Sequence, residues 1–126
     1  MTMSGINLKN KQKELRAVQL QRKKIIECFL KRDALIEGSY MEVLQKCGRT
    51  TCQCREKPIH LVSRLSKWVK GKLKHKVVKI EDRSRVRGYV ENYRKHKISM
   101  VTLTKNLEIE REIMNSIIKL KNISYD

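Results

Sequence analysis

A seven-residue repeat of apolar side chains runs through residues 82–122, a segment that contains no proline and one glycine. The strict spacing is kept by Val86, Tyr93, Met100, Leu107 and Met114. A companion row is interrupted by His96 and Glu110, but it includes Tyr89, Leu103 and Ile117. Apolar residues at this spacing are typical of a long helix with one buried stripe, so we predict a helix over residues 82–122.

A second helix is predicted over residues 6–37. Its seven-residue row is broken only by Arg22 and consists of Leu8, Leu15, Phe29 and Ile36. Good helix formers fill the outer face, and Gly38 can supply the turn that ends the helix. Two helices with such stripes, joined through a compact insert, are expected to pack antiparallel, either within one chain or between chains.

A β-hairpin is predicted over residues 61–80, with Lys70-Gly71 as its two-residue turn. This turn places Trp68, Leu73, His75 and Val77 on one face of the hairpin. The other face, near the tip, carries Lys67, Lys72, Lys74 and Lys76. Adjacent like charges across strands are unfavourable, so this row suits a bound anion. Alternatively, the lysines protect an edge strand against aggregation, and both explanations can hold.

Three of the four cysteines fall within residues 47–54, in the spacing C-x4-C-x-C. Structural zinc takes four sulfur or imidazole ligands, and the candidate set is Cys47, Cys52, Cys54 and His60. His75 and Cys28 are the other candidates for the fourth position, although Cys28 fits a small buried apolar residue better. The competing interpretation is a reduced, metal-free cluster in which Gly48 serves only a turn.

Composition sets the fold class. The chain has 126 residues, with 40% hydrophobic and 5% aromatic residues, which predicts one domain with an aliphatic, mostly helical core. We therefore expect a mainly α fold with a small β-hairpin, in which two long antiparallel helices flank a cysteine-rich knuckle, residues 38–60, and the hairpin. Trp68 and the tyrosines could stack on bases, but aromatics are few and we expect Trp68 in the core.

The charge is concentrated in one part of the chain. Residues 46–97 hold 17 basic and 4 acidic residues, which accounts for +13 of the net charge of +17. Acidic residues would serve solubility at least as well, so this pattern favours binding to a polyanion. The candidate phosphate contacts are Lys46, Arg49, Arg55, Lys57, Lys67, Lys70, Lys72, Lys74, Lys76, Arg83, Arg85, Arg87, Arg94 and Lys95.

Several function classes are disfavoured by the sequence. The carboxylates form no catalytic pair, and neither a Walker A motif nor a zinc-protease motif is present, so we expect no enzyme activity. No run of 18 apolar residues exists, so no membrane span is expected. The polar first thirteen residues lack the apolar segment of a secretory signal, which favours the cytoplasm and reduced thiols.

The ordered motifs resemble those of a small uncharacterised family of bacterial and archaeal proteins. The matching segments are Gly38-Ser39-Tyr40-Met41-Glu42, Lys46-Cys47-Gly48-Arg49, Cys52-Gln53-Cys54, Val69-Lys70-Gly71-Lys72 and Val90-Glu91-Asn92-Tyr93-Arg94. The resemblance spans residues 12–118, but the family's H-G-P-Y element is replaced here by Pro58-Ile59-His60-Leu61. Members are commonly encoded near transposases and other mobile elements, which implies a nucleic-acid setting without assigning an activity.

Together these observations predict a zinc-stapled, nucleic-acid-binding accessory protein of a mobile-element or reverse-transcription system. RNA is slightly favoured over DNA, because the basic residues extend over a knuckle and a hairpin and no recognition-helix motif is visible. The alternative is a helical oligomerisation or adaptor subunit that recruits a larger nucleic-acid enzyme through the seven-residue rows.

Overall fold

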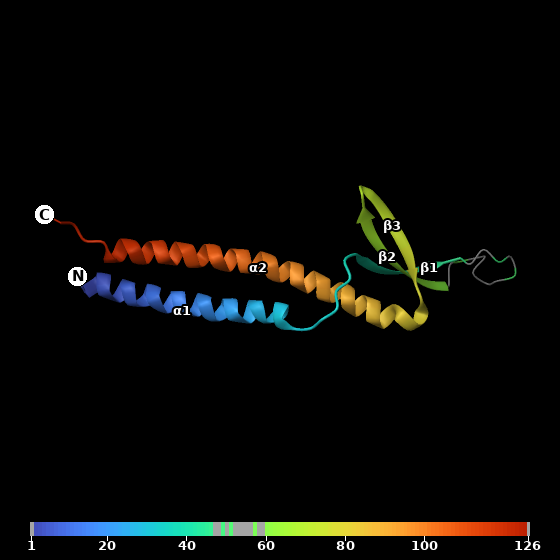
Figure 1. The fold of residues 1–126 in the computed structure, drawn as a ribbon, viewed down its shortest axis with the longest axis horizontal. Coiled ribbons are helices and arrows are strands. Elements are labelled where there is room, and N and C mark those ends of the chain that lie inside the picture. The colour runs from blue at the N-terminus through green and yellow to red at the C-terminus, as the bar shows by residue number, and fades with distance from the viewer. Residues whose placement is uncertain (1, 47–48, 50, 52–56, 58–59, 126) are drawn as a thin grey trace. The chain divides into compact units, whose positions relative to one another are not determined.

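The computed structural model describes residues 2–46, 49, 51, 57 and 60–125 (Figure 1). In chain order the elements are α1 (Thr2–Leu30), β1 (Ser39–Gln45), β2 (His60–Val69), β3 (Lys72–Val78), a 3₁₀ turn (Ile80–Asp82) and α2 (Arg83–Lys121). The prediction of a mainly helical chain with a hairpin is confirmed. The hairpin belongs to a three-stranded antiparallel sheet, because β1 forms within the segment assigned to the cysteine knuckle.

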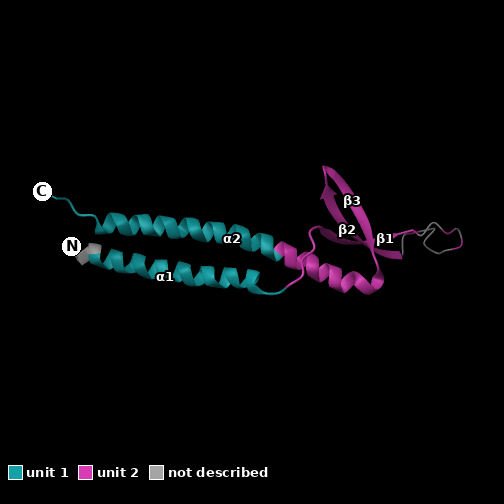
Figure 2. Ribbon diagram, in the orientation of Figure 1, with its two compact units in different colours: residues 1–32, 95–126 teal, residues 33–94 magenta. Residues whose placement is uncertain are grey.

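The chain divides into two compact units (Figure 2), and the single domain that the sequence predicts stays a prediction. Unit 1 consists of residues 1–32 and 95–126, and unit 2 of residues 33–94. Helix α2 contributes to both units, since its first twelve residues, 83–94, belong to unit 2 and the rest to unit 1.

Unit 1 is an antiparallel pair of helices. Its cross-helix contacts join Cys28 to His96, Arg22 to Glu110, and the Val18 carbonyl to Asn106. Cys28, near the end of α1, meets His96 in the first half of α2, whereas Val18 and Arg22, nearer the middle of α1, meet residues further along α2. This confirms the predicted antiparallel direction, and the pairing is within one chain.

The buried row of α2 in unit 1 is not the strict apolar row that the sequence favours. Ile113 and Ile117 are buried and Asn106 is only 3% exposed, whereas Leu107 is 46% and Met114 is 41% exposed. The buried residues lie on the companion row, at Ile117, and on the row next to it, at Asn106 and Ile113. The polar side chains on these rows have partners: the Asn106 amide donates to the Val18 carbonyl over 2.9 Å, and Glu110 accepts from Arg22.

Helix α1 ends at Leu30, seven residues earlier than predicted, and Gly38 does not terminate it. Residues 33–38 instead run alongside the start of α2 within unit 2. The Ile36 N–H donates to the Tyr89 carbonyl over 3.1 Å, and the Asn92 amide donates to the Ala34 carbonyl over 3.3 Å. These bonds replace the last helical turns that the sequence pattern suggests.

Gly38 has a different role from the one predicted. Its φ is +149°, a conformation that favours glycine, and an added Cβ would lie 2.9 Å from the Ser66 carbonyl oxygen. Gly38 therefore lets the chain pass closely over β2 as it enters β1.

The strand order is β1-β2-β3, with β2 central. The predicted hairpin register is confirmed: Val69 faces Lys72, Trp68 faces Leu73 and Ser66 faces His75. Lys70 and Gly71 both have positive φ, 51° and 79°, as a two-residue hairpin turn of this hand requires. The β1–β2 ladder runs from Ser39–Ser66 to Gln45–His60, so β2 and β3 continue beyond β1 as a two-stranded ribbon.

Helix α2 covers part of one face of the sheet within unit 2. On this face Ser63 is completely buried and Val78 is nearly so. Arg87 of α2 lies over the ring of Tyr40 at 5.8 Å and 3.9 Å from the Glu42 carboxylate. Tyr40 and Glu42 share this face with the predicted row of lysines, because residues alternate between faces along a strand.

Candidate nucleic-acid interface

The four lysines of the β2–β3 ribbon lie on one face, as the hairpin register requires. We call this set the lysine face: Lys67, Lys72, Lys74 and Lys76. All four are exposed, and Lys67 stands directly opposite Lys74. Lys70 adds a fifth exposed ammonium group at the turn.

Little in the described part of the chain neutralises the lysine face. Lys67 Nζ lies 3.5 Å from the Glu37 carboxylate, and both groups are exposed. None of the other four lysines at the ribbon has a carboxylate partner among the described residues. Like charges that face one another across strands destabilise a sheet, so the arrangement suits an external anion.

Arginines at the start of α2 are on the same side of the sheet but are partly engaged. Arg83 is half-buried and donates to the Leu61 carbonyl over 2.7 Å, which fixes the helix to β2. Arg85 pairs with Asp82 at 3.0 Å, and Arg87 lies near Glu42. Since Arg85 and Arg87 remain largely exposed, they can still meet phosphates, whereas Arg83 is mainly structural.

The remaining predicted phosphate contacts are more scattered. Arg94 is exposed and lies 3.6 Å from Glu91, and the exposed Lys95 follows it on α2 as the first residue of this helix in unit 1. Three more exposed residues lie along the connection between β1 and β2: Lys46, Arg49 and Lys57. Arg55 lies outside the described residues.

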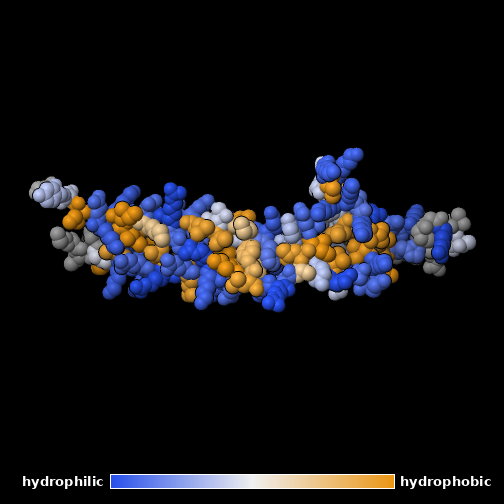
Figure 3. Space-filling model, viewed as in Figure 1, coloured by the Kyte–Doolittle hydropathy of each residue, from blue (hydrophilic) through white to orange (hydrophobic). Residues whose placement is uncertain are grey.

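The opposite face of the ribbon holds a residue that the sequence analysis misplaces. Trp68 is 69% exposed, so its expected place in the core is wrong. Leu73 and Val77 on the same face are also exposed. Among the described residues, the buried side chains of the sheet, Ser63 and Val78, are both on the lysine face rather than on the face of Trp68. Figure 3 shows apolar side chains at the surface of each unit.

A hollow of about 200 Å³ opens beside Trp68 within unit 2. Its lining combines two apolar side chains with polar and charged ones: Glu37, Gly38, Ser39, Ser66, Lys67, Trp68 and Leu73. The Ser66 hydroxyl lies 2.7 Å from His75 Nδ1. The sequence analysis misses this hollow because it predicts that residues 33–37 are helical and that Gly38 only ends the helix.

The predicted zinc ligands are only partly within reach of the structure. Cys47, Cys52 and Cys54 lie outside the described residues, so the zinc site stays a prediction. His60 is the first residue of β2 and pairs with Gln45, the last residue of β1, at the base of the segment that carries the three cysteines. In residues 2–46, 49, 51, 57 and 60–125, no three His, Cys, Asp or Glu side chains gather as a metal site.

The other two candidates for the fourth ligand have described partners. His75 contacts Ser66, and Cys28 is half-buried in unit 1 with its Sγ 3.8 Å from His96 Nδ1. The His96 ring also meets Phe29 edge-on, with centroids 5.3 Å apart. Cys28 is therefore part of the helix–helix contact, as its apolar character predicts.

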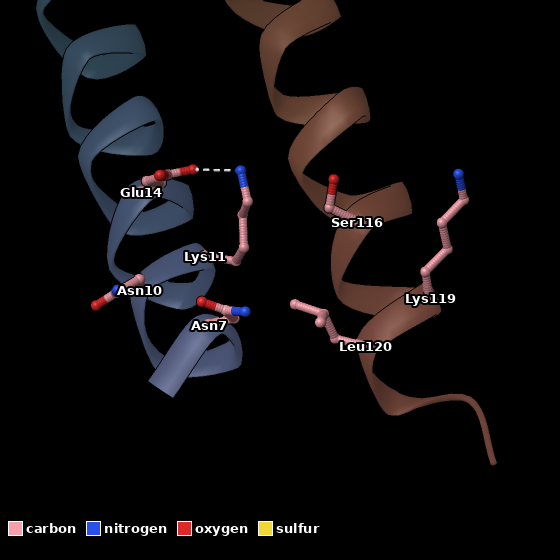
Figure 4. Close-up of a pocket in the computed structure, with 7 residues that line it drawn as sticks. All are labelled: Asn7, Asn10, Lys11, Glu14, Ser116, Lys119 and Leu120. Carbon is pink, nitrogen blue, oxygen red and sulfur yellow. Dashed lines mark hydrogen bonds and ion pairs between the residues drawn. The ribbon is translucent and has the colours of Figure 1, made fainter. Parts of the chain in front are cut away.

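A larger hollow of about 410 Å³ lies between the helices of unit 1, but it is not a convincing site (Figure 4). It is lined by ordinary helix-surface side chains, and Lys11 Nζ pairs with Glu14 at 3.1 Å. The perturbed pair in this unit, Arg22 and Glu110, is also structural. The hydrogen bond from Arg22 lowers the pKa of the Glu110 carboxyl and raises the pKa of the guanidinium.

Comparison with models of known protein families, with curated proteins and with solved structures finds no match. Within the part of the chain that the structure describes, neither helix has the apolar length that a membrane span requires.

Proposed function

We propose that this chain binds nucleic acid without catalysis, as an accessory protein of a mobile-element or reverse-transcription system. The observation that carries the proposal is the lysine face: four exposed lysines on one side of a two-stranded ribbon, with one weak carboxylate contact in the described structure. Such contacts neutralise phosphates and position a protein without reading the base sequence. The mobile-element setting comes from the family resemblance, and RNA is slightly favoured over DNA.

Fluorescence anisotropy with labelled single-stranded RNA and duplex DNA, in a reducing buffer that matches the cytoplasm, tests this proposal. We expect submicromolar binding at physiological salt and a steep fall of affinity as salt rises. Changing Lys72, Lys74 and Lys76 together to Glu should weaken binding more than tenfold and lower the salt dependence by about two to three released ions.

A matched control separates the lysine face from net charge. Lys9, Lys13 and Lys24 are exposed on α1, and their joint change to Glu alters the total charge by the same amount. This control should bind nearly as well as the unmodified chain. Equal losses in the two triple variants would show that only net charge matters, and absence of binding at physiological salt would overturn the proposal.

The proposal includes one structural zinc ion held by Cys47, Cys52, Cys54 and His60, whose chemistry matches a closed four-ligand site. When bound, zinc would tie together the segment that β1 and β2 close at its base. We expect one zinc per chain in protein purified without chelators. Cys52→Ser should lower this content, and Cys28→Ser, which changes a thiol in the helix contact of unit 1, should not.

A second candidate function is self-association or adaptor binding through unit 1. It is favoured by the seven-residue row on α2 that stays half-exposed: Met100, Leu107 and Met114. Apolar residues repeated at this spacing are typical of a helix that meets another helix. Light scattering should then show an oligomer that Leu107→Glu with Met114→Glu dissociates. Glu108→Lys with Glu112→Lys, at exposed neighbouring positions, is the control.

A further inference from the structure

The exposed ring of Trp68 beside a hollow is the feature that the nucleic-acid contacts above leave unused. A tryptophan with two thirds of its surface in water is uncommon unless the ring meets a partner. The hollow next to it is partly apolar, through Trp68 and Leu73. At its rim lie the Ser66 hydroxyl and the Glu37 carboxylate, which can accept hydrogen bonds.

The hollow lies at the edge of the ribbon and is lined by residues from both of its faces. Strand β1 begins at Ser39, opposite Ser66, so among the described residues no strand pairs with this edge of β2 beyond Ser66. Lys67 belongs to the lysine face and also lines the hollow. A polyanion whose phosphates contact the lysine face can therefore place the group attached to the next phosphate beside Trp68, past this edge of β2.

Charge decides which partner suits this surface. A second copy of the ribbon would bring its own lysine face and Lys70 toward ammonium groups of the same sign. A polyanion with flat apolar rings satisfies both features, because its phosphates match the lysines and its rings match the indole. Unpaired nucleobases have this chemistry, and stacking on aromatic side chains accepts any base.

We propose that the hollow beside Trp68 binds one unpaired nucleobase, stacked on the indole ring, of a single strand whose phosphates contact the lysine face. This inference rests on the nucleic-acid binding proposed above and adds a preference for single strands. In a duplex the bases are already stacked on one another, and exposing one costs free energy.

Trp68 is the only tryptophan in the chain, so its fluorescence reports on this site alone. We expect a ten-nucleotide single-stranded RNA or DNA to quench the emission as it binds. Heparin, a polyanion without bases, should bind the protein in a parallel anisotropy competition but leave the emission nearly unchanged. A blunt duplex of the same length should quench less than the single strand at equal saturation.

The controls separate this inference from the proposed function. Binding of the labelled oligonucleotide without any change of Trp68 emission would overturn the inference and leave nucleic-acid binding intact. Equal quenching by heparin or by the duplex would also overturn it. No binding of any oligonucleotide would remove the proposed function itself, and the inference with it.

Variants supply a second readout that does not depend on fluorescence. By anisotropy, Trp68→Ala should weaken single-strand binding about fivefold to a hundredfold, and Trp68→Phe should retain most of the affinity because it keeps a stacking ring. Val77→Ala is the matched control, since Val77 is exposed on the same face but does not line the hollow. Equal affinities for the Ala and Phe variants would contradict stacking.

Discussion

The two units differ in how well the spacing of apolar residues in the sequence indicates which side chains are buried. In unit 1 the helix contact contains a charged pair and a buried amide, while an apolar row remains half-exposed on α2. In unit 2 the ribbon places its four lysines on one face, with Val69 among them, and Trp68 with Leu73 on the other. A turn of defined length fixes which strand residues share a face, but a seven-residue repeat does not show which of two adjacent rows is buried. In this chain, alternation along the hairpin therefore predicts which side chains share a surface more reliably than the seven-residue repeat of the helices does.

The largest expected effect comes from the contrast between two rows of α2. Ile117 is buried and Met114, three residues earlier, is half-exposed. Ile117→Ala should lower the free energy of unfolding by about 2–4 kcal/mol, because it leaves a cavity in a small core. Met114→Ala should cost less than about 1 kcal/mol. Urea denaturation followed by circular dichroism measures both, and the reverse order would show that the apolar row is the buried one.

The next effect concerns unit 2. Gly38→Ala should lower stability by about 1–3 kcal/mol, because the residue would keep a positive φ and its Cβ would approach the Ser66 carbonyl. Gly88→Ala is the matched substitution on α2, where an added Cβ meets no atom within 4 Å. It should stabilise the protein by roughly 0.5–1 kcal/mol. A Gly38→Ala variant as stable as the unmodified protein would contradict the close approach at Gly38.

The charged pair of unit 1 predicts a pH dependence of stability. The folded-state pKa of Glu110 is lowered from its ordinary value of 4.5 by the hydrogen bond from Arg22. Its contribution to stability is therefore complete above about pH 4.5 and is lost as the pH falls through the lower folded-state pKa. Glu110→Gln should flatten this part of the stability profile, measured by urea denaturation between pH 3 and 7. An unchanged profile would show that the pair contributes little.

The smallest expected effect tests the strain on the lysine face. Lys74→Glu places an acidic residue opposite Lys67 and should stabilise the protein by about 0.2–1 kcal/mol. Lys79→Glu makes the same charge change at an exposed position beyond β3 and should leave stability nearly unaltered. Thermal melts at low salt, where charge effects are largest, compare the two. If Lys74→Glu also weakens nucleic-acid binding, the face is adapted to its ligand rather than to folding.

The sequence predicts the backbone of this fold better than its contacts. The two-residue turn determines the register of β2 and β3, and the long proline-free segment determines α2. The end of α1 was predicted wrongly because hydrogen bonds from Ile36 and to Ala34 draw the chain away from helical geometry, and such tertiary bonds leave no local pattern. Strand β1 was missed for a similar reason, since its pairing with β2 is non-local.

The candidate site divides in the same way. The lysine face follows from alternation and the turn, so its residues could be named from the sequence. The hollow at Trp68 depends on where residues 37–39 pass over β2, which only the tertiary structure shows. The polar interruptions of the two helical rows, Arg22 and Glu110, were visible in the sequence, but their pairing with one another was not recognised.

The pairing of Gln45 with His60 gives residues 46–59 an unusual freedom to vary. The sheet already holds the two ends of this segment together. The pairing of β1 with β2 therefore offsets the entropy cost of bringing these ends together, and a ligand of the segment does not have to. Changes of length or of cysteines between Gln45 and His60 should therefore leave the ribbon and both helices unchanged.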